Sequence, residues 1–125
     1  MANPNIAAVT GIYGNTSTTA LSSTSATSIV SNASASGKVY KINSLIVANV
    51  DGTAAADITI NLYSAAALGG TATAIASTIS VPADASLIII DKTTSIYLLE
   101  DKSIGAIAGA ANDLVVTCSW EEINA

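Results

Sequence analysis

The chain has 125 residues, which is enough for one domain with its own hydrophobic core. Its net charge is −5, and its four lysines and absent arginines argue against binding to nucleic acid or to anionic membranes. It has no histidine, which excludes Ser-His-Asp and Cys-His catalysis and the usual zinc ligand. Neither a secretion signal nor a run of the roughly 18 apolar residues that span a membrane is found, so we expect a soluble protein made in the cytoplasm.

Residues 1–14 form a lead of small residues that carries a few larger apolar side chains. We predict that this lead is either an extra strand or an arm that reaches a neighbouring subunit. Its candidate interface residues are Ile6, Val9, Ile12 and Tyr13. Residues 15–125 are predicted to form a single β-sandwich domain.

Residues 15–32 are rich in serine and threonine, with apolar anchors at alternate positions. This pattern predicts two antiparallel strands, and a flexible linker is the alternative. The stretch from Gly37 to Tyr63 then holds two long β-type runs on either side of Asp51-Gly52. We predict a hairpin here, because Asp-Gly accepts the positive φ that tight turns need.

Alternation within these two runs assigns faces to their side chains. In the second run, the apolar residues at 58, 60 and 62 form a buried face, and Tyr63 falls on the polar face with Asp57 and Asn61. Tyr63 is therefore predicted to be exposed and is a candidate subunit contact. In the first run, Ile42 and Ile46 share one face while Leu45 and Val47 share the other, so that strand is expected to be covered on both sides.

Five further alternating or wholly apolar runs follow, at residues 73–81, 87–90, 96–99, 104–109 and 114–120. No segment of ten or more residues has a helical period. The sequence therefore predicts an all-β fold, an antiparallel β-sandwich of jelly-roll type with about eight strands and an N-terminal arm. In the last run, Cys118 and Trp120 share a face with Leu114 and Val116, so we expect both to be core residues.

The remaining chemistry lies in carboxylates and in one tryptophan. Asp91, Glu100 and Asp101 sit at strand ends and could meet as an acid pair, but solvated turn carboxylates are the simpler interpretation. Asp51 with Asp57 or Asp113 could bind calcium, although no calcium-binding loop motif is present. Trp120 could be a sugar platform. We expect no enzymatic activity and assign no catalytic, cofactor-binding or metal-binding residue.

Three stretches together are similar to a family of small virion structural proteins of tailed phages, especially cyanophages. They are KVYKINSLIVANVDGTAAADITINLY, VPADASLIIIDKTTSIYLLEDKSI and AANDLVVTCSWEEI, within a similarity that covers most of the chain from about Thr18 to Ile123. The chain has Glu100-Asp101-Lys102-Ser103 where the resemblance predicts a glycine in the turn. The family implies no activity and no cofactor.

This resemblance implies a virion location after synthesis in the host cytoplasm. The expected role is a capsid decoration or cement protein, which stabilises the head by bridging subunits of the major capsid protein. Other virion proteins are alternative partners. We also expect a homo-oligomer, with a trimer as one option because capsid lattices have three-fold positions. The alternatives are a neck, tail or fibre component, or a module that binds host polysaccharide.

Overall fold

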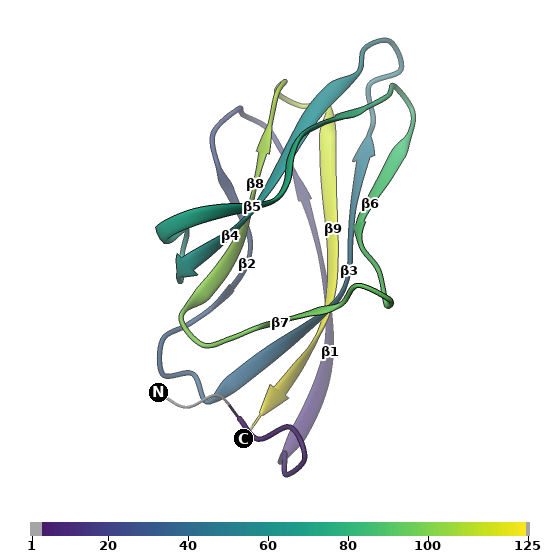
Figure 1. Cartoon of the computed structure of the whole chain (residues 1–125). Helices are drawn as coiled ribbons and strands as arrows, with labels where there is room; N and C mark the ends of the chain where they lie inside the picture. The colour runs from purple at the N-terminus through teal and green to yellow at the C-terminus, as the bar shows by residue number, and fades with distance from the viewer. Residues whose placement is uncertain (1–3, 125) are drawn as a thin grey trace.

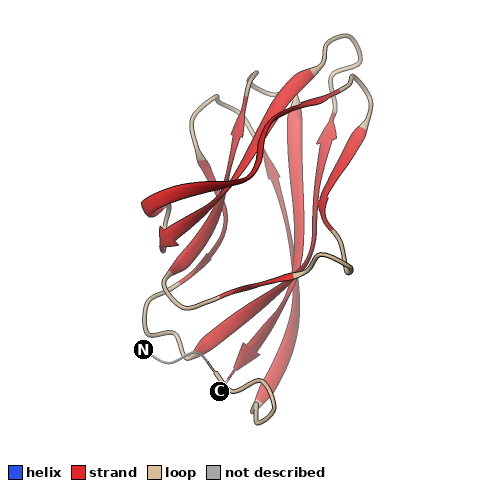
Figure 2. Cartoon of the chain, in the orientation of Figure 1, coloured by secondary structure: helices blue, strands red, loops and turns tan. Residues whose placement is uncertain are grey.

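The computed structural model describes residues 4–124 and contains only strands, turns and loops within that range. Figure 2 shows the strands and the loops that join them. The strands are β1 (Gly11–Ala20), β2 (Thr27–Asn32), β3 (Lys38–Asn49), β4 (Ala56–Ala65), β5 (Gly69–Val81), β6 (Ser86–Ile90), β7 (Ile96–Leu98), β8 (Lys102–Ala108) and β9 (Leu114–Asn124). The predicted all-β class is confirmed, with nine strands in the described part instead of about eight.

The strands form two antiparallel sheets that pack face to face (Figure 1). One sheet has the order β1-β9-β3-β6, with the short β7 added against β3, and the other has the order β2-β8-β4-β5. Without β7, this is the strand order of a jelly roll, which has eight strands in two four-stranded sheets and two Greek keys. We call the first the β1 sheet and the second the β2 sheet.

The hydrophobic core fills the space between the two sheets. Its fully buried side chains come from both inner faces, and they include Leu45, Val47 and Val116 from the β1 sheet and Ile58 and Ile60 from the β2 sheet. Cys118 is fully buried among them, as predicted. Trp120 is half-buried and packs against the same core.

The predicted hairpin across Asp51-Gly52 is wrong. β3 pairs with β9, β6 and β7, whereas β4 pairs with β5 and β8, so the connection crosses from one sheet to the other. Gly52 has no positive φ. Instead of a tight turn, Asp51 Oδ1 accepts hydrogen bonds from the backbone N and the hydroxyl of Thr53 at 3.1 and 3.0 Å.

A β-bulge changes which residues of β3 face the core. Its register with β9 shifts between Ile42 and Ser44, so Asn43 is the extra residue. As a result, Ile42 below the bulge and Leu45 above it are both fully buried, although they differ in parity. The expectation that Ile42 and Ile46 share a face was wrong because one inserted residue reverses the alternation.

Two buried asparagines hold loops against the ends of the sandwich. Asn32 Nδ2 donates to the carbonyls of Lys38 (2.9 Å) and Leu98 (3.2 Å), and its Oδ1 accepts from the Ser36 hydroxyl at 2.6 Å. Asn49 Nδ2 likewise donates to the carbonyls of two residues, Ala54 (3.0 Å) and Val81 (2.9 Å). A buried amide that meets several backbone groups fixes loop positions that apolar contacts leave free.

The turn before β8 adopts the backbone conformation that favours glycine. Asp101 has a φ of +55°, in the left-handed region that an L-residue adopts only at a cost. The resemblance predicted a glycine in this turn. The Asp101 side chain offsets part of that cost, since its Oδ1 accepts a hydrogen bond from Ala66 N at 3.1 Å.

Candidate interaction surface

The N-terminal lead lies at one end of the molecule, beside the end of the last strand (Figure 1). Residues 5–8 make a turn in which the Asn5 side chain accepts from Ala7 N and the Asn5 carbonyl accepts from Ala8 N, both at 3.0 Å. Thr10 N then donates to the Asn124 carbonyl at 3.0 Å, which joins the lead to β9. Within this turn, Ile6 exposes 52% of its surface.

The structure places the last part of the predicted lead inside a strand. Residues 11–14 belong to β1, which pairs with β9 over its whole length from Gly11 opposite Asn124 to Ala20 opposite Val115. Residues 4–10 precede the strand, and residues 1–3 lie outside the described range. A deletion meant to remove only the lead should therefore stop at residue 10.

Ile12 and Tyr13 lie at the start of β1 and point to opposite faces of the β1 sheet. Ile12 is opposite Ile123 and exposes 56% of its surface, and Tyr13 is opposite Glu122 and exposes 57%. Val9 is half-buried. The structure thus brings three of the predicted interface side chains, those of Ile6, Ile12 and Tyr13, to the outside of one segment of chain.

Tyr63 does not belong to this surface, and the prediction that it is exposed is wrong. It lies on the outer face of the β2 sheet, as alternation required, yet it exposes only 7% of its surface. The cause is the turn between β4 and β5, which folds over that face. Leu68 N donates to Ser103 Oγ at 3.0 Å, and the same hydroxyl donates to the Ala65 carbonyl at 2.8 Å.

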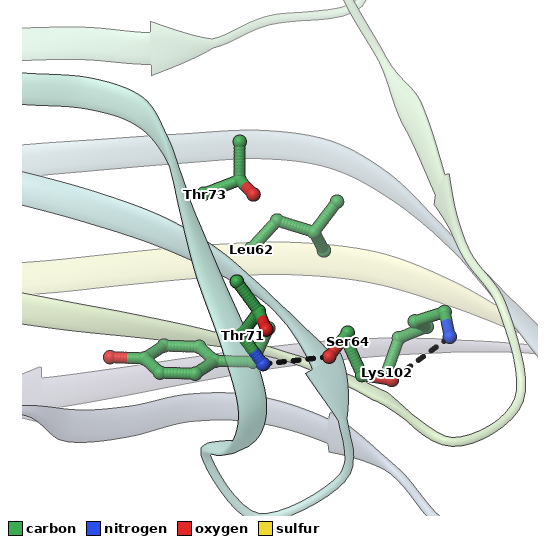
Figure 3. Close-up of a pocket in the computed structure, with 6 residues that line it drawn as sticks. Leu62, Ser64, Thr71, Thr73 and Lys102 are labelled. Carbon is green, nitrogen blue, oxygen red and sulfur yellow. Dashed lines mark hydrogen bonds between the residues drawn. The ribbon is translucent and has the colours of Figure 1, made fainter.

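A small open hollow of about 200 Å³ lies beside this turn (Figure 3). Lys102 Nζ donates to the Ser64 carbonyl at 3.0 Å, and Thr71 N donates to Ser64 Oγ at 2.7 Å. These polar groups of the hollow, on Lys102, Ser64 and Thr71, are therefore hydrogen-bonded to one another within the chain. The hollow is lined by Leu62, Tyr63, Ser64, Thr71, Thr73 and Lys102. Nothing in it marks a particular ligand.

A stacked aromatic pair lies near the same end of the β1 sheet as the lead. The rings of Tyr40 and Trp120 have centroids 6.1 Å apart and an interplanar angle of 29°. Glu122 lies opposite Tyr40 on β9, and one of its carboxylate oxygens is 3.3 Å from Lys38 Nζ. Burial raises the pKa of Tyr40, and the negative charge of Glu122 raises it further. Trp120 stacks on Tyr40 and packs on the core. This packing explains the presence of the tryptophan without the sugar platform that the sequence left open.

Two of the three carboxylates that could have formed an acid pair, Asp91 and Asp101, accept hydrogen bonds in turns. Asp91 Oδ1 accepts from Thr93 N at 2.9 Å and from the Thr93 hydroxyl at 2.5 Å, and these bonds lower the pKa of Asp91. Asp101 Oδ1 accepts a hydrogen bond from Ala66 N. Glu100 is buried, with 8% of its surface exposed. Across residues 4–124, no three potential metal-binding side chains gather in one place.

Burial raises the pKa of Cys118 to about 12, so its thiol stays protonated at neutral pH. No helix in residues 4–124 is long and apolar enough to cross a membrane.

Comparisons with known proteins include a remote structural likeness. No family model matches the sequence, and no curated protein matches it. Among solved structures, the chain is similar to one described as the structure of infectious bursal disease virus Gx strain, with 13% identity and a TM-score of 0.39. The likeness covers 90% of this chain and 33% of that one, so the chain spans about a third of the other's length. A score this low carries no argument about function.

Proposed function

We propose that this chain is a structural subunit of a phage virion that decorates the outside of the head. In this role, the N-terminal lead and the start of β1 bind the major capsid protein. The resemblance of the sequence to phage virion proteins supports a virion structural role. The fold by itself does not, because a jelly roll serves many functions. The observation that carries the binding role is the exposure of Ile6, Ile12 and Tyr13, each above 50%, on one segment of chain.

The expected strength of this contact follows from the area that it would bury. Burying a large apolar side chain completely contributes about 1.5–3 kcal/mol, so covering the exposed half of each of these three contributes about 1 kcal/mol. Ile12 and Tyr13 point to opposite faces of the β1 sheet, so a partner that covers all three side chains contacts both faces at the start of β1. The three then contribute about 3 kcal/mol together, which corresponds to about a hundredfold in the dissociation constant. Substituting these side chains should therefore produce a measurable loss of binding.

The test combines three substitutions, Ile6→Ser, Ile12→Ser and Tyr13→Ser, and measures binding to particles that lack the chain. We expect binding to weaken about a hundredfold while the melting temperature of the free protein stays near that of the wild type. The matched control is Val50→Ser with Ile88→Ser, since these side chains are 60% and 61% exposed. Equal binding by both variants and the wild type would overturn the proposed surface.

A second measurement tests the location in the virion. Quantitative mass spectrometry of purified particles gives the number of copies of this chain relative to the major capsid protein. A number that scales with the capsid lattice supports decoration. A number equal to one or two small rings would instead place the chain in the neck, tail or fibre, and its absence from particles would overturn a virion role.

A further inference from the structure

The two sheets have four edges, one of which β6 shares with the three-residue β7, and the β1 edge differs from the other three. β5 has three register irregularities against β4, β2 has one against β8, and β6 has only five residues and one irregularity against β3. Bulges and short length are devices by which proteins prevent other strands from adding to an edge. β1 has ten residues, no irregularity against β9, no proline and no charged residue.

The register shows which backbone groups of β1 are unpaired. Leu21 N donates to the Leu114 carbonyl, and this pair continues the register in which Thr19 lies opposite Val116 and Ser17 opposite Cys118. Hydrogen-bonded pairs alternate along an antiparallel ladder, so the odd-numbered residues of β1 bond to β9. The N–H and C=O groups of the even-numbered residues, from Ile12 to Ala20, therefore point away from the sheet.

We propose that this edge pairs with β1 of a second copy of the chain, antiparallel, about a two-fold axis at Thr16. The two β1 sheets then form one continuous sheet of eight principal strands. In this register, Thr16 lies opposite the same residue of the second copy, Gly14 lies opposite Thr18, and Ile12 lies opposite Ala20. The five even-numbered positions of each copy supply about ten backbone hydrogen bonds across the axis.

A second copy fits this edge because β1 is complementary to itself. The strand carries no charge, so self-pairing places no like charges opposite each other. Threonine meets threonine at the axis, a cross-strand pair that is favourable in sheets. The register also places Asn15 of one copy opposite Ser17 of the other. The Ser17 hydroxyl is buried and has no partner among the described residues, so the amide of Asn15 supplies the missing one.

The first test is Thr16→Pro, read by light scattering and by sedimentation of the free protein. The Thr16 N–H points away from β9, so proline removes no backbone bond within the chain and an edge strand accepts it. Within the chain it removes only the exposed hydrogen bond from the Thr16 hydroxyl to Ser119 Oγ, at 3.2 Å. We expect the wild type to have twice the chain mass of 12.4 kDa and the variant to dissociate about 10- to 100-fold more readily. A wild type that is monomeric at high micromolar concentration, or a trimer that the substitution leaves intact, would overturn the proposal.

The second test locates the axis. In Thr16→Cys, the two new thiols face each other with Cα atoms about 5.5 Å apart, within the range of a disulfide. We expect mild oxidation to cross-link this variant into a dimer. The control is Ser77→Cys on the exposed, irregular edge β5, which should remain uncross-linked. The native Cys118 is buried and does not compete. Equal cross-linking of both variants would refute the position of the axis. Neither test uses virus particles, so they are independent of the proposed function.

Discussion

Replacing Gly105 by alanine should destabilise the fold, although glycine in a strand interior is itself unfavourable. Gly105 lies in β8 between Ser28 of β2 and Asn61 of β4. A Cβ at this position would point to the outer face of the β2 sheet. It would lie 2.6 Å from Leu68 Cδ2 and 2.9 Å from Tyr63 Cε2, both well inside normal contact distance. The turn that buries Tyr63 therefore packs into the space that the glycine leaves, and a Cβ there would force Leu68 and Tyr63 to shift.

The size of the effect is the difference between two opposing contributions. Forcing an extra methyl group into a packed site costs about 1–3 kcal/mol, because neighbouring side chains must move. Alanine restricts the unfolded chain, which returns about 0.4–1 kcal/mol. The net loss of unfolding free energy is thus about 1–2 kcal/mol, or a melting temperature lower by about 3–10 °C for a domain of this size.

Thermal unfolding followed by circular dichroism measures this change, and Gly14→Ala is the matched control. Gly14 also lies in a strand, and a Cβ there meets nothing within 4 Å, so we expect no loss of stability. Adding Leu68→Ala to the Gly105→Ala variant removes the nearest clashing atom. The double variant should therefore lose less stability than the sum of the two single changes. Equal melting temperatures for Gly105→Ala and Gly14→Ala would refute the reasoning.

Three further predictions concern buried polar groups. Asn32→Ala removes three hydrogen bonds and leaves two carbonyls without the amide, so chemical denaturation should show a loss of about 2–4 kcal/mol. Cys118, with a pKa of about 12, should react with a thiol reagent at neutral pH only after denaturant is added, and rapid labelling of the folded protein would contradict its burial. The raised pKa of Tyr40 means that the folded state holds this proton more tightly than the unfolded state. Its contribution to stability is complete below the ordinary pKa of 10.0 and is lost as pH rises through the higher folded value. Glu122→Gln should lower the pKa of Tyr40, measured by ultraviolet absorbance, and an unchanged titration would exclude a role for that charge.

Alternation of side chains was sufficient to predict most strands and the faces of the simplest ones. The last strand is an example, because Leu114, Val116 and Cys118 alternate without interruption and are all buried. The pairing of strands was not predictable in the same way. Asp51-Gly52 is compatible with a hairpin, but it serves here as a crossing between sheets. That choice depends on which partners bury the most apolar surface, which local sequence does not encode.

The candidate interaction surface was also predictable only in part. Ile12 and Tyr13 were named as candidate interface residues from their place in the lead, and the structure leaves both exposed at the start of β1. Burial of Tyr63 did not follow from its polar face. Alternation assigns a face, but only the path of the next turn decides whether that face is covered. The glycine at 105 was a usable signal, because a central strand with a glycine often marks a close approach by another part of the chain.

The pairing of the first strand with the last has a consequence for the order of events in folding. Gly11 lies opposite Asn124 and Ala20 opposite Val115, so β1 can pair with β9 only after residues 115–124 have been synthesised. Contacts so distant in sequence slow folding, because the closure of a long loop precedes the gain from pairing. Until β9 has been synthesised, both edges of β1 remain unpaired. A nascent chain held on the ribosome just short of residue 114 should thus be the stage at which copies of this protein aggregate most readily.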